Sequence, residues 1–178
     1  MLRRALFASL MAAVLSACGK SQQEASVVSG GKIDAKLKEL GIILPEASTP
    51  IAAYTPYRVV DNLVYIAGQG PSNQGKLGRD FTTEQGYGFA RDAGIGALSQ
   101  LKKACDGDLD RVVQCVQIQG IVNCTADFTE QHLVINGCSE LFRDLFGDRG
   151  LAARAAVGTN SLPVGFACEV ITVFEIRT

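Results

Sequence analysis

The segment at residues 165–176, GFACEVITVFEI, constrains the fold most, because it alternates like a β-strand and is apolar on both faces. One face carries Phe166, Cys168, Val170 and Phe174, and the other carries Ala167, Ile171 and Val173. A strand buried on both faces needs a cover on each side of its sheet. We therefore expect helices on one face and a second cover, such as another subunit, on the other.

The rest of the chain supplies two long helices and further strands for that sheet. Apolar residues recur at helical spacing over residues 83–105 and 131–146, and more briefly over 33–40. Two β-rich runs surround Asp61-Asn62, which predicts a hairpin, and residues 111–122 and 152–158 have the pattern of strands. The order hairpin, helix, strand, helix, strand, strand predicts an α+β sheet with its helices on one face.

The helix expected over residues 83–105 has a marked start and an unusual composition. Thr82 and Gln85 have the spacing of a capping box. Four glycines lower its intrinsic helix propensity: Gly86, Gly88, Gly94 and Gly96. Their presence predicts close packing of this helix on the sheet.

The N-terminus has the pattern of a targeting segment. Arg3 and Arg4 precede an apolar run over residues 5–17, which is shorter than the roughly 20 residues that span a bilayer. Leu15-Ser16-Ala17-Cys18 matches a bacterial lipobox, which predicts lipidation of Cys18, and an ordinary secretory signal is the alternative. We expect a signal peptide at 1–17, a flexible tether at 18–32 and one domain at 33–178. Such a protein would be lipid-anchored in the bacterial cell envelope and face the periplasm, with the outer membrane favoured by Gly19.

Charge and side-chain counts argue against several classes of function. Without residues 1–17 the chain keeps 15 of its 17 basic residues and all 18 acidic ones, a formal charge of −3. That balance, without a basic cluster, argues against a nucleic-acid partner. Beyond Cys18 five cysteines remain, so at most two internal disulfides are expected. His132 is the single histidine and is expected at the surface; no metal site and no cofactor are predicted.

Arg154 and Glu169 lie fifteen positions apart in a segment of otherwise small and apolar residues. Charged groups in such segments are unfavourable unless they are paired, hydrogen-bonded or used. A guanidinium binds a carboxylate through two parallel hydrogen bonds, and a carboxylate can move the proton of a water molecule. The charge pattern alone leaves a structural ion pair and a functional site equally open.

Several motifs resemble the reactive intermediate deaminase family, also called RidA, YjgF or L-PSP endoribonuclease. They are the hairpin YTPYRVVDNLVYIAGQGP, the helix motif NGCSELF, and RAAVGTNSLPVGFACEV near the C-terminus. The resemblance covers residues 48–176. KLKELGIILP and GRDFTTEQGY resemble the family's longer, chorismate-mutase-like endoribonuclease branch. The family fold is a mixed sheet with two long helices on one face, assembled as a trimer.

The resemblance also implies a site between subunits of a homotrimer. In it, Arg154 would hold a substrate carboxylate, and Glu169 would position or deprotonate the attacking water. Tyr54 and Asn136 would line the pocket, and the backbone at Gly68 would approach the ligand. The family's cysteine two residues after the arginine is replaced by Ala156.

The implied activity is hydrolysis of a small 2-imino acid, or the related enamine, to a 2-keto acid and ammonia. An imine beside a carboxylate is electrophilic, so orientation and one placed water supply most of what the reaction needs. The alternative is a trimeric module that binds small carboxylates at the cell envelope without turnover. A ribonuclease function is opposed by the acidic charge and the single histidine.

Overall fold

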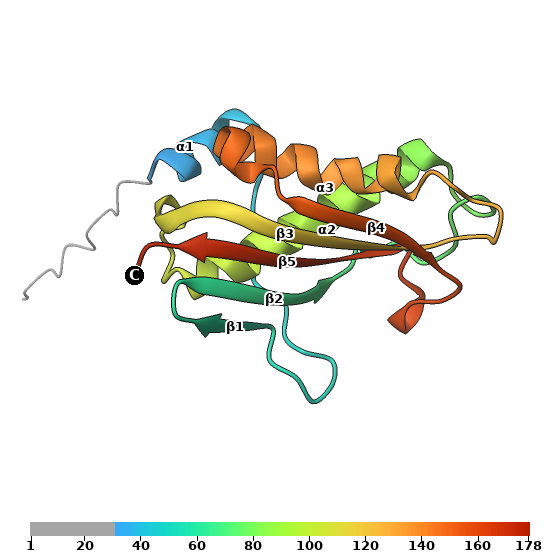
Figure 1. Ribbon diagram of the computed structural model, residues 1–178, viewed down its shortest axis with the longest axis horizontal. Helices are drawn as coiled ribbons and strands as arrows, with labels where there is room; N and C mark the ends of the chain where they lie inside the picture. Colours follow the sequence, from blue (N-terminus) through green and yellow to red (C-terminus); the bar gives the residue numbers. More distant parts are fainter. Residues whose placement is uncertain (1–30) are drawn as a thin grey trace, which may run out of the picture.

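The computed structural model describes residues 31–178 as one mixed five-stranded sheet with two long helices on one face (Figure 1). The strands are β1 (Tyr57–Val60), β2 (Leu63–Gln69), β3 (Val112–Asn123), β4 (Ala153–Thr159) and β5 (Cys168–Ile176). The helices are α1 (Lys32–Glu39), α2 (Thr83–Ala104) and α3 (Gln131–Phe146), with 3₁₀ turns η1 (Leu109–Arg111), η2 (Gly147–Gly150) and η3 (Pro163–Gly165). The predicted α+β fold, a mixed sheet with two long helices on one face, is confirmed. The expected signal peptide, Cys18 and most of the expected tether lie outside the described residues.

The strand order is β1-β2-β5-β3-β4, so the segment that is apolar on both faces occupies the centre of the sheet. Only β3 and β4 run parallel, and the other neighbours are antiparallel. Helix α2 covers β2 and β5, and α3 covers β3 and β4 (Figure 1). The opposite face of the sheet carries no helix within the described part of the chain.

Local signals in the sequence account for where the elements begin and turn. Thr82 and Gln85 form both hydrogen bonds of the capping box that starts α2. Val60 pairs with Leu63 across a two-residue turn, in which Asp61 adopts φ 53°. Gly147, at φ 66°, ends α3.

The two faces of β5 are buried to different extents. Cys168, Val170 and Phe174 are fully buried under the helices, where Phe174 meets Phe142 edge-to-face with ring centroids 5.2 Å apart. Ile171 and Val173, on the opposite face, are half-buried. The second cover predicted for this face is thus not supplied by residues 31–178.

The helical glycines serve a different contact from the one predicted. A side chain on Gly94 would meet Leu141 and Cys138 of α3 at 3.0 and 3.2 Å, and one on Gly137 of α3 would clash with the Tyr87 carbonyl of α2. These glycines therefore allow the two helices to approach each other. Gly96 alone matches the prediction, because it lies over Gln69 of the sheet.

Strand β5 begins at Cys168, three residues later than its pattern predicts. The turn η3 precedes it, and Val164 in that turn adopts φ 49°. Strand alternation therefore does not extend to Phe166, which was predicted on the same face as Cys168. The ring lines the pocket that also contains Glu169.

Helix α1 is attached to the domain by its N-terminus. The carboxylate of Asp110 accepts the backbone N–H groups of Lys32 and Ile33, both at 2.8 Å, and so caps the helix from a distant part of the chain. Ile33 and Leu37 are buried beneath it. None of the helices in the described residues combines the length and hydropathy needed to cross a membrane.

The five cysteines of the domain are free thiols and all are buried: Cys105, Cys115, Cys124, Cys138 and Cys168. Burial raises the pKa of Cys115 and of Cys168 to about 12. Here they pack as small apolar side chains.

Candidate functional site

Arg154 lies where the edge strand β4 meets α3. It is in register with Ile118 of β3, a residue buried under the helices, so its side chain leaves the sheet on the helical face. There Nη1 donates to Asn136 Oδ1 at 2.8 Å and to Ser139 Oγ at 3.0 Å, and Nη2 donates to the His132 carbonyl at 3.3 Å. Asn136 and Ser139 are three positions apart on α3 and therefore share one face of the helix.

The partners of Arg154 are neutral. No carboxylate of residues 31–178 lies within 4.0 Å of its guanidinium, and the residue is exposed. Three neutral oxygens orient the guanidinium without cancelling its charge. This arrangement suits the binding of an anion from solvent.

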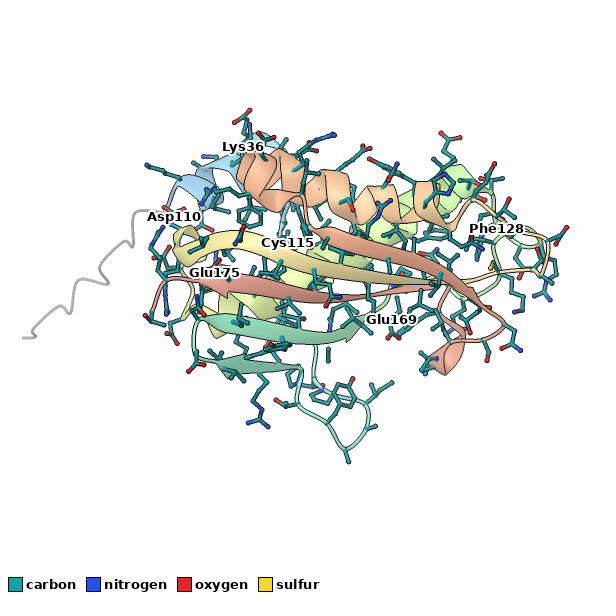
Figure 2. All side chains as sticks on the ribbon, viewed as in Figure 1. Lys36, Asp110, Cys115, Phe128, Glu169 and Glu175 are labelled. Carbon is teal, nitrogen blue, oxygen red and sulfur yellow. The ribbon has the colours of Figure 1, made fainter. Side chains whose placement is uncertain are left out.

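Glu169 lies on the opposite face of the sheet. It is in register with Ile121, on the side of β3 and β5 that the helices do not cover. Figure 2 shows it near one end of β5, with Glu175 near the other. A cavity of about 400 Å³ opens beside it and is lined by residues of three segments: Ile51, Ala52, Tyr54, Thr55, Ala67, Gly68, Pro163, Phe166 and Glu169.

The carboxylate of Glu169 is half-buried and receives no hydrogen bond from the described residues. This burial raises its pKa. The side chain lies across Gly68 of β2, where any β-carbon would clash with Oε1. A side chain at position 68 would therefore displace the Glu169 carboxylate from its present place.

A second cavity of about 150 Å³ adjoins the first. The two share Ile51, Tyr54, Gly68 and Phe166, so together they form one continuous site under the loop that precedes β1. That loop extends beyond the β1 edge of the sheet (Figure 1). We refer to the two cavities together as the Glu169 pocket.

The structure thus divides the predicted site residues into two groups. Tyr54, Gly68 and Glu169 come together in the Glu169 pocket, and Arg154 and Asn136 come together on the other face of the sheet. Within one chain the sheet separates the two groups. An internal Arg154–Glu169 ion pair, one of the two readings left open by the sequence, is therefore wrong for the single chain.

Three contributors were not predicted from the sequence. Ser139 could have been found by helical periodicity, since it lies one turn after Asn136. Ile51 and Phe166 carry no comparable signal, because a loop and a 3₁₀ turn place them in the pocket. His132 is exposed as expected, and its backbone carbonyl is the part that contacts Arg154.

The ionisable side chains do not gather as metal ligands would. Across residues 31–178, no group of three or more His, Cys, Asp or Glu side chains is placed to hold an ion.

Comparison with known proteins identifies the relatives of the chain. A family model described as "YjgF/chorismate mutase-like, putative endoribonuclease" matches residues 34–176. "Protein TCP17" of Trypanosoma cruzi is 39% identical over 159 residues, which cover 85% of this chain and 99% of that protein.

Two solved structures resemble it closely. The protein Atu1372 from Agrobacterium tumefaciens, described as of unknown function, is 38% identical with a TM-score of 0.77, over 82% of this chain and 93% of that one. A structure named as a putative endoribonuclease from Shewanella oneidensis is 30% identical with a TM-score of 0.79, over 82% of this chain and 100% of that one. The match over residues 34–176, together with these relatives, shows that the chain belongs to the YjgF/chorismate mutase-like family.

Proposed function

We propose that the protein hydrolyses small 2-imino acids to 2-keto acids and ammonia, at a site completed between two copies of the chain. Arg154 of one copy binds the substrate carboxylate, and Glu169 of the next takes a proton from water as its oxygen adds to the imine carbon. That proton passes to the imine nitrogen, which gives a carbinolamine. Glu169 then moves the hydroxyl proton of this carbinolamine to the nitrogen, the C–N bond breaks, and ammonia leaves as the keto group forms. The observation that carries this proposal is that the two charged side chains lie on opposite faces of one sheet, and neither has a charged partner among residues 31–178.

The surroundings of Arg154 support its role. A guanidinium held by Asn136, Ser139 and a backbone carbonyl is oriented in advance, so less conformational freedom is lost when a carboxylate binds. Its exposure leaves N–H groups available to that carboxylate.

The surroundings of Glu169 support a role in proton transfer. Its pKa is raised by burial, and a carboxylate with a raised pKa is a stronger base toward water. The Glu169 pocket has room for a small substrate and a water molecule beside the carboxylate.

In a ring of three copies, Arg154 of one copy would lie next to Glu169 of its neighbour. The helix-free face of the sheet exposes apolar side chains that include Tyr65 and Val157, which suits an interface between copies. In a closed ring the same two surfaces meet at every interface, so each contains one Arg154 and one Glu169. Light scattering at micromolar concentration should give the mass of a trimer, and a monomer mass would contradict the proposal.

Subunit mixing tests the shared site directly. Arg154→Ala and Glu169→Gln chains should each be inactive toward freshly generated 2-iminopropanoate, measured by release of the keto acid. In mixed trimers from co-expression, about a quarter of the interfaces combine both native residues, so about a quarter of wild-type activity should return. If activity does not return on mixing while wild type is active, the two residues do not act across an interface. An inactive wild type that still binds a small carboxylate at Arg154 would support the binding-module alternative.

The N-terminal sequence extends the proposal to location. The lipobox at Leu15–Cys18 would anchor the domain in the bacterial cell envelope, facing the periplasm, with the outer membrane favoured. In that compartment, oxidation of amino acids is the class of reaction that would supply imino acids. Cys18→Ser should move the protein out of the membrane fraction or leave it unprocessed. A wild-type protein that is cleaved and soluble would contradict the anchor.

A further inference from the structure

The wall of the Glu169 pocket is built on a β-bulge. Ile66 of β2 pairs with Thr172 and Gln69 pairs with Val170, so three steps along β2 oppose two steps along β5. The extra residue falls at Ala67 and Gly68, which both line the pocket. A bulge removes backbone groups from the ladder, and their carbonyls then need other partners.

The side chain of Gln69 supplies those partners. Its amide nitrogen donates to the Ala67 carbonyl at 3.0 Å and to the Gly68 carbonyl at 3.1 Å. The side chain is 8% exposed and lies on the helical face of the sheet, under Gly96 of α2. Gln69 therefore holds the bulge from the face opposite to Glu169.

A second glutamine extends this arrangement. Ser48 Oγ donates to Gln69 Oε1 at 3.3 Å. The amide nitrogen of Gln100, a fully buried residue of α2, donates to the Ser48 carbonyl at 2.8 Å and to Ser48 Oγ at 3.1 Å. The hydrogen bonds thus run from α2 through Ser48 to the bulge, and Ser48 begins the segment that reaches Tyr54.

Gln100 makes these contacts at a cost to the core. Its Oε1 is buried and has no hydrogen-bond partner among the described residues. An apolar side chain would avoid that unpaired oxygen, so packing alone does not explain a glutamine here. The two hydrogen bonds that it donates to Ser48 explain why position 100 is a glutamine.

We propose that Gln69 and Gln100, joined through Ser48, are positioning residues that hold the Gly68 bulge and the loop of Tyr54 against Glu169. Gln69 lines the smaller cavity of the pocket, Gln100 acts on it through Ser48, and the chemistry is left to Glu169. This inference rests on the proposed function for its kinetic consequence only. The placement of Glu169 can be measured without any turnover.

Two substitutions separate positioning from packing. Gln100→Met keeps an unbranched side chain and removes both the donors and the unpaired oxygen. Thr172→Val is the matched control, because Thr172 Oγ1 is also buried and unpaired; Thr172 flanks the same bulge on β5 but takes no part in the hydrogen bonds that join Gln100, Ser48 and Gln69. Thr172→Val should melt at or above the temperature of the wild type, since it only loses a buried unpaired oxygen. Gln100→Met also loses its two hydrogen bonds to Ser48, but Ser48 is exposed and can bond water, so the melting temperature should stay near that of the wild type.

The two variants should differ in function. Gln100→Met should lower kcat/KM for 2-iminopropanoate by about 10- to 100-fold, the loss expected when a wall of the site is misplaced. It should also shift the pKa of Glu169 followed by carbon NMR, whereas Thr172→Val should leave both unchanged. Gln69→Glu places an oxygen against the Ala67 and Gly68 carbonyls in place of the donating NH2 group. Like Gln100→Met, it should lower kcat/KM and shift the pKa of Glu169.

The NMR measurement keeps the two proposals apart. If the wild type does not hydrolyse the imine, the proposed function fails. The positioning role of Gln69 and Gln100 is then tested by the pKa of Glu169 alone. Positioning is refuted if Gln100→Met leaves that pKa and the kinetics as in the wild type. It is refuted equally if Thr172→Val produces the same changes, because the effect would then belong to the core in general.

Discussion

The junction of β4 with α3 and the Glu169 pocket hold their charged groups in contrasting ways. At the junction, Arg154 is exposed, and neutral oxygens of Asn136, Ser139 and His132 orient it. In the pocket, Glu169 is half-buried, has no hydrogen bond from the described residues, and lies over a glycine. The first arrangement favours a fixed charge that can bind an anion, and the second favours a carboxyl group that exchanges protons.

The contrast also shows why one chain is insufficient for the proposed reaction. Binding the substrate carboxylate and moving the proton of water are assigned to opposite faces of the same sheet. Had the two charges faced each other in one chain, each would have neutralised the other. Their separation keeps both available within one chain, and the proposed function requires that a second copy bring them together.

The largest effect is expected from removing the anion-binding group. Arg154→Ala should reduce affinity for a small carboxylate by about 2–5 kcal/mol, because a charge-assisted, forked contact is lost. Stability should change by only about 0.5 kcal/mol, since the side chain is exposed and water can replace its hydrogen bonds. Arg154→Lys should recover part of the affinity, as an ammonium lacks the fork. Calorimetric binding beside thermal melting measures both, and a large loss of stability with unchanged binding would contradict the assigned role.

A second substitution introduces an ion pair at Arg154, which has none with residues 31–178. Asn136→Asp places a carboxylate where Nη1 of Arg154 now meets a neutral oxygen at 2.8 Å. Anion affinity should fall by about 1.5–3 kcal/mol, the strength of a charge-assisted hydrogen bond, while the melting temperature rises. Asn136→Ala is the matched control and should weaken binding less. Equal affinities for Asn136→Asp and the wild type would show that the neutrality of this partner is unimportant.

Sequence patterns predicted most of the fold because the determining signals are local. The capping residues of α2, the turn at Asp61-Asn62 and the two-faced apolar strand all depend on near neighbours. The 3₁₀ turn before β5 escaped prediction, because it depends on Val164 adopting a positive φ that its residue type disfavours.

The division of the site between two faces was not predictable. Strand β4 consists mainly of alanine and glycine, so its sequence lacks the alternation of polar and apolar residues that identifies a buried face. Arg154 could therefore have left either side of the sheet. The bulge in β2 could not be predicted either, because its residues Ala67 and Gly68 are small and do not interrupt the alternation over residues 63–69.

The third prediction concerns the room made for Glu169. Gly68→Ala places a β-carbon against Oε1 of Glu169 and should displace the carboxylate, at a cost of up to about 1 kcal/mol because the end of that half-buried side chain can move aside. Activity should fall even in the folded fraction. Gly88→Ala is the control, because Gly88 lies on α2 with open space around it and should be stabilised by helix propensity. Chemical denaturation measures the stability of each variant, and imine hydrolysis measures its activity. If Gly68→Ala matches the wild type in both, the Glu169 carboxylate does not lie against Gly68.

The smallest effect concerns the contribution of Glu169 to stability. Burial raises its pKa above the value of 4.5 that applies when the chain is unfolded, so the folded state favours the protonated carboxyl. The stabilisation from that proton is complete below pH 4.5 and is lost as the pH rises through the higher folded-state pKa. Glu169→Gln should therefore match the wild type at acid pH and become the more stable of the two at neutral pH.

Glu175 provides the comparison for this last prediction, because it lies on the same strand and the same face (Figure 2). Its two carboxylate oxygens accept hydrogen bonds from Asn62 at 2.9 Å and from Gln114 at 2.7 Å. Glu175→Gln should lose one of these bonds, because its NH2 group cannot accept, and weaken the other; stability at neutral pH should fall, the opposite sign to Glu169→Gln. Urea denaturation of both variants across the pH range would decide the point. If the two substitutions change stability in the same direction at neutral pH, Glu169 is not the desolvated carboxyl group that the proposed chemistry requires.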